Sequence, residues 1–298
     1  WEEPAPPGFP PAPEGAAEAP SLDMIWTLEA GGADEPGTLW AGTLPGGLFV
    51  SRDRGASWRL VETLWDRPER AQWFGGGYDH PGIHSVLVDP RDARRLTVGI
   101  SCGGVWKSDD GGAHWRQAGR GLRAAYLPPE QAYDPTSQDP HRLAACAAAP
   151  DRVWCQHHNG VFRSDDGAET FTEVAEGAFG FAVAAHPHAP DTAWFAPAVK
   201  DECRVPRDGR LAVTRTDDAG AGFAEFRDGL GGRGAGDGDG GGARYDLIYR
   251  HALAVDADGE SLAMGSTTGN LWTSASGGRV WTQVSDGLPP IAALAFAG

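Results

Sequence analysis

Seven polar residues with sugar-binding or proton-transferring side chains lie in loops or at the starts of apolar segments. They are Tyr78, Asp79, His80, His84, His141, Arg250 and His251. Histidine changes its charge between about pH 5 and 8, and arginine pairs with acidic groups. If each apolar segment is an innermost strand of a repeated sheet, the loops that enter these strands converge, and the seven residues line a polar funnel. A plainer interpretation also stays open, a solvated channel whose polar groups only satisfy strand ends.

The spacing of the histidines argues against a compact metal motif. His84, His141 and His251 stand 57 and 110 residues apart, whereas short metal motifs keep their ligands within a few residues of one another. A repeated architecture alone would produce such intervals. The chain also shows no phosphate-binding loop, dinucleotide fingerprint or nucleophile elbow. We therefore predict neither a metal nor a cofactor.

Four loop acids keep a hydrolytic function open. A glycosidase needs two carboxyl groups about 5–10 Å apart. The candidates are Asp79, Asp201, Glu202 and Asp246. The sequence therefore leaves two functions: a scaffold that binds a glycan or a protein in the funnel, and an exo-glycosidase that uses loop carboxylates.

The elements that must position these residues are repeats. An octet of the form Ser/Thr-x-Asp-x-Gly-x-x-Trp/Phe recurs five times, at 51–58, 108–115, 164–171, 216–223 and 274–281. Successive copies start 52 to 58 residues apart, close to the period of propeller blades. The third copy has Ala168 in place of the glycine, and the last copy has Ser276 in place of the aspartate, so we expect the last turn to be the weakest.

Four strand-like segments accompany each octet. A short apolar strand precedes the octet, a polar-alternating strand follows it, and a further pair lies upstream, beginning with a nearly continuous apolar run such as HSVLV at 84–88. Such a run indicates a strand buried on both faces. Four-stranded sheets repeated radially are the β-propeller architecture, so we predict an all-β propeller with each octet in the turn between the third and fourth strands of a blade.

The octet reads as a structural turn. An aspartate carboxylate accepts backbone N–H bonds within its own turn, and glycine supplies a positive φ. The aromatic residue at the eighth position can pack into the seam between blades. We therefore assign Asp53, Asp110, Asp166 and Asp218 a structural role and no catalytic one.

The octets resemble the Asp-box, or BNR, repeat of sialidases and other propeller glycosidases. The wider arrangement resembles a bacterial family of sialidase-like BNR-repeat proteins often labelled glycosyl hydrolases, on the segments QHHNGVFRSDDG at 156–167, GRLAVTRT at 209–216 and YRHALAVD at 249–256. The resemblance implies a seven-bladed ring. It carries over no sialidase residues, because the Arg-Ile-Pro motif is absent and its nearest approach, Arg204-Val205-Pro206, lies in a mid-chain loop.

We expect residues 1–22 to form a Pro/Ala-rich linker or wrap-around loop and residues 23–298 to form the propeller. The expected blades span 23–65, 82–122, 141–177, 178–228 and 249–286. The segment IAALAF at 291–296 is predicted to be a lone inner strand whose partners lie upstream of Trp1, as part of a seven-bladed ring. A smaller ring closed within this chain is the alternative.

The composition of the chain limits which partners and which compartment are expected. The net charge of −16 repels the phosphates of nucleic acids and anionic membranes. No apolar run of membrane-spanning length and no signal-peptide pattern occurs, which favours a cytoplasmic protein, with secretion open because the chain starts at Trp1. The cysteines are expected to be buried thiols, or else Cys146 and Cys155 pair across a hairpin. The Gly-rich segment 229–243 is expected to be a flexible insertion, with a calcium loop through Asp237 and Asp239 as the alternative.

Overall fold

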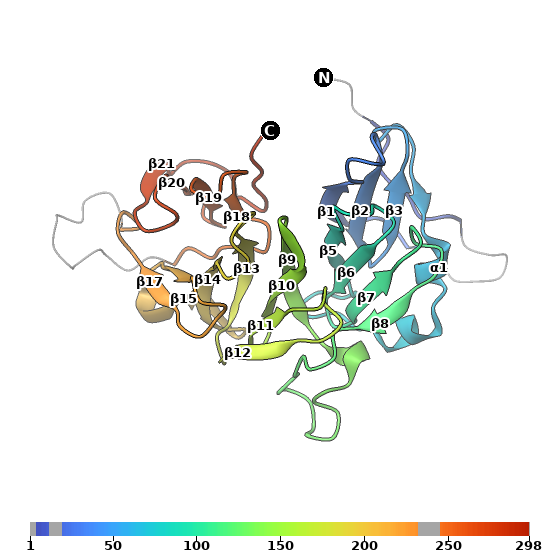
Figure 1. The fold of residues 1–298 in the computed structure, drawn as a ribbon, viewed down its shortest axis with the longest axis horizontal. Helices are drawn as coiled ribbons and strands as arrows, with labels where there is room; N and C mark the ends of the chain where they lie inside the picture. Colours follow the sequence, from blue (N-terminus) through green and yellow to red (C-terminus); the bar gives the residue numbers. More distant parts are fainter. Residues whose placement is uncertain (1–3, 12–19, 232–244, 298) are drawn as a thin grey trace. The chain divides into compact units, whose positions relative to one another are not determined.

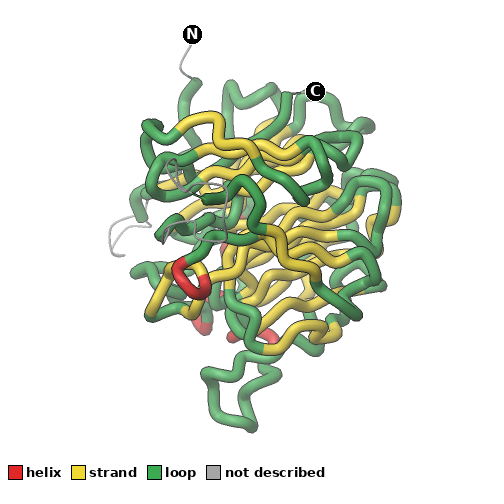
Figure 2. The backbone as a smooth tube through the Cα atoms, turned by 90° about the vertical axis from the view of Figure 1, so that its left-hand side faces the viewer, coloured by secondary structure: helices red, strands yellow, loops and turns green. Residues whose placement is uncertain are grey.

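The computed structural model describes residues 4–11, 20–231 and 245–297. The expected calcium loop through Asp237 and Asp239 lies outside these residues, as does much of the expected linker. The chain divides into two compact units, Trp1–Pro140 and His141–Gly298. Strands make up the regular structure of both units, and helices are confined to a few short turns (Figure 2).

The first unit contains two four-stranded antiparallel sheets, each with its strands in chain order (Figure 1). The first sheet consists of β1 (Met24–Ala30), β2 (Leu39–Leu44), β3 (Leu48–Ser51) and β4 (Arg59–Leu60). The second consists of β5 (Ile83–Val88), β6 (Leu96–Ile100), β7 (Gly104–Ser108) and β8 (Arg116–Ala118). Three short helical turns, α1 (Glu62–Trp65), η1 (Pro68–Gln72) and η2 (Pro135–Ser137), lie in the connections.

The second unit contains three further antiparallel sheets built in the same way. Its first sheet holds β9 (Pro140–Cys146), β10 (Ala149–His157), β11 (Gly160–Ser164) and β12 (Thr172–Glu176). Its second follows the path β13 (Gly180–Ala185), β14 (Ala193–Lys200), β16 (Val213–Thr216) and β17 (Ala224–Phe226). Strand β15 (Cys203–Pro206) pairs with β14, and the helical turn η3 (Arg207–Gly209) lies between β15 and β16. Its third holds β18 (Leu253–Val255), β19 (Leu262–Gly265), β20 (Leu271–Ser274) and β21 (Thr282–Ser285). The prediction of five four-stranded antiparallel blades is thus confirmed.

Each octet forms the predicted turn between the third and fourth strands. The hydroxyl of its first residue accepts the N–H of the fifth, as from Gly112 to Ser108 at 2.9 Å. The carboxylate of its third residue accepts the N–H of the seventh, as from His114 to Asp110 at 2.9 Å. Ser276 replaces the aspartate in the last copy and accepts the N–H of Val280 at the same 2.9 Å, so the geometry of that turn is kept.

The fourth residue of every octet ties the turn to its own sheet. Its N–H donates to a carbonyl in the connection between the first and second strands or in the adjoining strand end, at 2.8–3.1 Å in all five copies. The five donor and acceptor pairs are Arg54 and Gly37, Gly111 and Arg94, Gly167 and Asp151, Ala219 and Asp191, and Gly277 and Glu260. Each sheet is therefore closed at this end by the octet.

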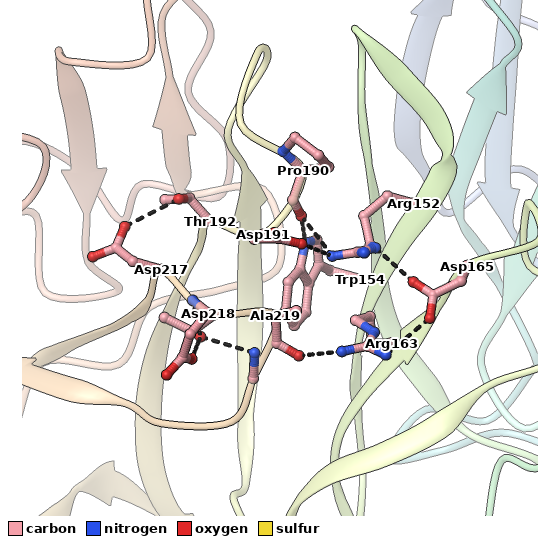
Figure 3. Close-up of polar contacts among 12 residues, drawn as sticks. Arg152, Trp154, Arg163, Asp165, Pro190, Asp191, Thr192, Asp217, Asp218 and Ala219 are labelled. Atoms are coloured by element: carbon pink, nitrogen blue, oxygen red, sulfur yellow. Dashed lines mark hydrogen bonds and ion pairs between the residues drawn. The ribbon is translucent and has the colours of Figure 1, made fainter.

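In the second unit, arginines on the third strands link successive sheets. Arg163 on β11 donates to the carbonyl of Ala219 at 2.5 Å, and Arg215 on β16 donates to that of Gly277 at 2.8 Å. Both acceptors are the fourth residue of the octet in the following sheet. Figure 3 shows the first of these seams, where Arg152 lies between Asp165 and Asp191 and its nitrogens are 2.7 and 2.5 Å from their carboxylates.

Tryptophans fill the core of each unit. Trp40, Trp106, Trp154, Trp194 and Trp272 are at most 1% exposed. In the first unit Trp40 and Trp106 belong to one cluster with Trp73 and Trp115. In the second unit Trp194 and Trp272 belong to a cluster that also contains Trp281, the eighth residue of the last octet. An aromatic residue of that octet therefore packs into the core, as expected.

Three sequence expectations are corrected. The apolar run in β1 is not buried on both faces, because Ile25 is 41% and Leu28 is 57% exposed. Residues 204–206 do not form a loop, because β15 pairs with the end of β14 and gives that sheet a fifth strand. The segment 291–296 forms no regular strand: Ala293 makes one parallel bridge to His251, and Leu294 donates its N–H to the carbonyl of His251 at 2.8 Å.

Three of the four cysteines are buried free thiols, as the first of the two expectations has it, and the fourth is exposed. No disulfide joins them, although all four lie in the described part of the chain. Cys102, Cys146 and Cys155 are buried, and Cys203 is exposed. Among the described residues, no helix is long and apolar enough to cross a membrane.

Candidate functional site

Three of the predicted funnel residues, His141, Arg250 and His251, come together in the second unit, near the starts of β9 and β18, the first strands of its first and third sheets. His141 opens β9, and its ring stacks on Phe181 of β13 with the centroids 4.6 Å apart and the planes 18° apart. Arg250, just before β18, places its guanidinium carbon 5.0 Å from the centroid of the same ring. Phe181 thus joins a histidine and an arginine that stand 109 positions apart in the sequence.

Arg142 brings the third residue into this group. Its guanidinium donates to the carbonyl of Arg250 at 3.0 Å and contacts Nδ1 of His251. We call His141, Arg142, Phe181, Arg250 and His251 the Phe181 cluster. His141 is 2% and Arg250 5% exposed, so this positive charge is held largely away from solvent, which is costly unless aromatic faces and hydrogen bonds offset it.

Aromatic and charged neighbours surround the Phe181 cluster. Phe179 meets Phe181 edge to face at 5.2 Å, and Tyr249 does so at 6.2 Å. The guanidinium carbon of Arg204 lies 5.4 Å from the Phe181 centroid, and the same guanidinium pairs with Asp201 at 2.5 Å. Three arginines, two histidines and the acid Asp201 thus gather at one place in the second unit, and the guanidinium groups suit an anionic ligand.

The four other predicted residues belong to the first unit. Tyr78 and His84 both pack edge to face on Trp26, at 5.2 and 5.7 Å. His84 is fully buried and its Nδ1 is 2.9 Å from the hydroxyl of Ser85, whereas Tyr78 is 44% exposed. Asp79 and His80 lie at the surface. The structure therefore brings Tyr78 and His84 together, and a single funnel holding all seven residues stays a prediction.

A second polar group in the first unit was missed by sequence reasoning. The buried carboxylate of Asp139 accepts hydrogen bonds from the hydroxyl of Ser101 and the N–H of Cys102, both at 3.2 Å. Cys102 has a φ of 46°, a left-handed backbone that a cysteine seldom adopts. Burial, followed by the nearby charge of Asp139, raises the pKa of Tyr126 well above its usual value. The sequence carries no repeat that marks these positions, because they lie in connections and not in the octets.

Three of the four loop acids proposed for hydrolysis, Asp201, Glu202 and Asp246, are engaged with neighbouring groups. Asp246 is 3% exposed, and its Oδ1 accepts hydrogen bonds from Ser266 at 2.8 Å, from Asn270 at 2.6 Å and from Thr268. The backbone N–H of Glu202, followed by the charge of Lys200 at 3.6 Å, holds the pKa of Glu202 below its usual value. Asp246 therefore acts as a turn anchor in this arrangement.

Comparison with known proteins identifies the fold. No protein-family profile and no curated protein sequence matches the chain. Among solved structures, the GH74 xyloglucanase from Xanthomonas campestris superposes with a TM-score of 0.58 at 19% identity, over 84% of this chain and 37% of that one. YCF48 from Cyanidioschyzon merolae superposes with a TM-score of 0.51 at 15% identity, over 88% of this chain and 74% of that one. An ancestral GH74 enzyme superposes with a TM-score of 0.50 at 17% identity, over 68% of this chain and 24% of that one.

These similarities concern the fold alone. The identities are all below 20%, and the chain spans about a quarter and a little over a third of the two GH74 enzymes. Propellers support many unrelated activities. The five sheets with their octet turns are those of a β-propeller, and the resemblance to sialidase-like repeat proteins stays a prediction.

Proposed function

We propose that this chain is a propeller scaffold that binds an acidic glycan at the Phe181 cluster. The observation that supports the proposal is that Arg250 and His141 both contact the ring of Phe181. The guanidinium carbon of Arg250 is 5.0 Å and the ring centroid of His141 is 4.6 Å from the Phe181 centroid. Arginine recognises a carboxylate by a two-pronged hydrogen bond. A uronic or sialic acid carries such a carboxylate.

Titration calorimetry with a matched pair of ligands tests the proposal. Oligomers of galacturonic acid and their methyl esters share a sugar skeleton and differ in charge, so we expect the acid to bind at least tenfold more tightly than the ester. Replacing Arg250 and His251 by alanine should abolish this preference, and Arg250→Lys should retain part of it. Equal affinity for acid and ester, or unchanged binding by the double variant at an unchanged melting temperature, would contradict the proposal.

Glycoside hydrolysis is the second candidate. The observation in its favour is that two of the similar structures are GH74 enzymes and one of them is named as a xyloglucanase. The exposed Asp79 is the loop acid that we would replace first, by asparagine. Release of reducing ends from xyloglucan, or of a chromophore from aryl glycosides, by the parent and not by Asp79→Asn would support this function over binding alone.

A further inference from the structure

A pair of histidines in the second unit offers a metal site that is separate from the arginines of the Phe181 cluster. His158 lies in the turn between β10 and β11, and its ring centroid is 5.5 Å from that of His141. One ring nitrogen of each residue lies within 4.8 Å of the other. Two nitrogens bound to one ion at about 2.0–2.1 Å lie roughly 3.3–4.2 Å apart, so a small rotation of the half-buried His158 closes the pair around an ion.

Hydrogen bonding sets His141 in the form that binds metals. Its Nδ1 is 2.6 Å from the carbonyl of Gly180. A carbonyl only accepts, so Nδ1 carries the proton and the lone pair of the neutral ring is on Nε2. Metal-binding histidines almost always donate their other N–H in this way, which fixes the tautomer and the orientation of the ring.

Packing holds both rings in place. Phe179 meets His141 at 5.4 Å and His158 at 5.5 Å, in both cases edge to face. His141 is also stacked on Phe181. The same phenylalanine therefore fixes the orientation of both imidazole rings.

The charge of Arg250 affects which further ligands a bound metal ion would have. Arg250 contacts the ring on which His141 stacks, and its positive charge opposes a bare dication. A metal bound here is therefore expected to carry an anionic or water ligand on the side of the arginine.

From these observations we infer that His141 and His158 form a two-histidine site for a divalent transition metal of the copper and zinc class. Imidazole nitrogens suit Cu²⁺, Ni²⁺ and Zn²⁺, and the expected order places Cu²⁺ first. This inference does not depend on the proposed glycan binding, because the metal alone is its probe.

Equilibrium dialysis of the chelator-treated full chain against Zn²⁺ and Cu²⁺ tests the site, with the bound metal measured by atomic emission. We expect one ion per chain, nitrogen hyperfine structure in the electron paramagnetic resonance spectrum of the Cu²⁺ form, and a melting temperature that rises with metal. His141→Gln and His158→Gln should each lower the affinity at least tenfold and remove the rise in melting temperature.

His114→Gln is the matched control. His114 is an exposed histidine whose Nδ1 lies 2.6 Å from the carboxylate of Asp110, so it represents adventitious surface binding and its loss should leave the affinity unchanged. His158→Gln, at a half-buried turn, keeps the test decisive if His141→Gln fails to fold. Absence of a bound ion, or undiminished binding and unchanged hyperfine structure in a folded His158→Gln chain, would overturn the inference.

Discussion

In the four octets that have an aspartate, the hydroxyl of the first residue is more deeply buried than the carboxylate two positions later. Ser108 is 1% exposed and accepts the N–H of Gly112 at 2.9 Å and that of Asp110 at 3.3 Å. The side chain of Asp110 is 43% exposed, so water can replace the bonds that it accepts. We therefore expect the serine or threonine to contribute more to the stability of the turn than the aspartate does.

A pair of alanine substitutions in one turn separates the two roles. Ser108→Ala leaves the buried N–H of Gly112 without its acceptor, and we expect a loss of about 1–3 kcal/mol in the free energy of unfolding. Asp110→Ala should cost clearly less. Denaturant unfolding of the two variants measures both effects. A larger loss of unfolding free energy in Asp110→Ala than in Ser108→Ala would show that the carboxylate contributes more to stability.

The octet carboxylates also predict how stability depends on pH. Hydrogen bonds from Ser57 and Ser51 lower the pKa of Asp53 to about 2, and those from His114 and Ser108 lower the pKa of Asp110 to about 2. Because the folded pKa lies below the unfolded value of 3.8, this stabilisation is full above about pH 4 and is lost as the pH falls toward 2.

We therefore expect the melting temperature to fall between pH 4 and pH 2 more steeply in the parent than in an Asp53→Asn, Asp110→Asn double variant. The last octet, with Ser276, contributes nothing to this slope. Identical slopes in parent and variant would show that these bonds do not form in solution.

At the residue scale the sequence was a good guide wherever a position repeats. The octet pattern predicted the turns and the structural role of Asp53, Asp110, Asp166 and Asp218, because a carboxylate, a glycine and their spacing carry the turn geometry themselves. Asp139 and Cys102 gave no such signal. A left-handed φ at a cysteine and a carboxylate bonded 37 positions away depend on how the connections pack.

At the scale of elements, the arginine seams are the features that hold successive sheets of the second unit together. Arg215 lies over Trp194 with its guanidinium carbon 5.3 Å from the ring centroid, pairs with Asp217 at 2.6 Å and donates to the carbonyl of Gly277. The indole N–H of Trp194 donates to the same carbonyl at 2.8 Å. One octet carbonyl thus receives two donors from the preceding sheet.

Replacement of Arg215 should lower the free energy of unfolding. Arg215 is 12% exposed at its side chain, and hydrogen bonds to charged groups contribute about 1.5–3 kcal/mol, so we expect Arg215→Met to lose about that amount in chemical denaturation. Arg52→Met is the control, since Arg52 is 52% exposed in its pair with Glu35 and exposed pairs contribute about 0–1 kcal/mol. Equal losses in the two variants would contradict a structural role for the seam.

A further prediction concerns the turn after β13. The Nδ1 of His186 accepts the N–H of His188 at 3.0 Å and that of Ala189 at 3.1 Å, an arrangement that only the neutral ring permits. Burial, His188 and Arg215 lower the pKa of His186. A histidine with a lowered folded pKa stabilises the fold above its unfolded pKa of 6.5, and this stability is lost as the pH falls below that value.

Melting curves between pH 7.5 and pH 5 are expected to show this loss. His186→Gln should flatten the dependence, whereas His80→Gln, at an exposed loop position, should leave it as in the parent. A variant that keeps the full parental slope would assign the pH dependence to other groups.

The errors at the element scale have physical causes. The run in β1 was interpreted as buried because apolar residues usually are, yet exposure depends on what covers the strand. Strand β15 was missed because Arg204-Val205-Pro206 is short and ends in proline, which is tolerated where a strand has only one partner. IAALAF has strand composition but makes a single bridge, because backbone pairing is decided by its neighbour and not by its own residues.

For the whole molecule, the net charge of −16 leads to opposite salt effects on stability and on binding. Added salt screens the repulsion among the excess acids and should raise the melting temperature at pH 7, since exposed ion pairs contribute little. The same screening should weaken an anionic ligand at the Phe181 cluster. Melting curves and calorimetric titrations in low and moderate NaCl measure both, and parallel changes would count against an electrostatic ligand site.

The sequence argument that inner strands begin near one another placed seven residues in one funnel. The structure shows contacts that link three of them, His141, Arg250 and His251, within the second unit. The sequence argument did not indicate Phe181, the ring that organises them, or Arg142, because both resemble ordinary core or strand residues in the sequence. The seven-bladed ring and the common funnel stay predictions.

The imidazole of His186 lies nearly parallel to the indole of Trp194, with centroids 5.7 Å apart and planes 18° apart. A protonated imidazole accepts an electron from an excited indole, whereas a neutral one scarcely does. Trp194 is shielded from solvent, so dissolved quenchers reach it poorly and the stacked imidazole of His186 can quench its emission directly. Protonation of His186 should therefore be visible in the fluorescence of the protein. We expect the short-wavelength emission of buried tryptophan to decrease on mild acidification, before the protein unfolds.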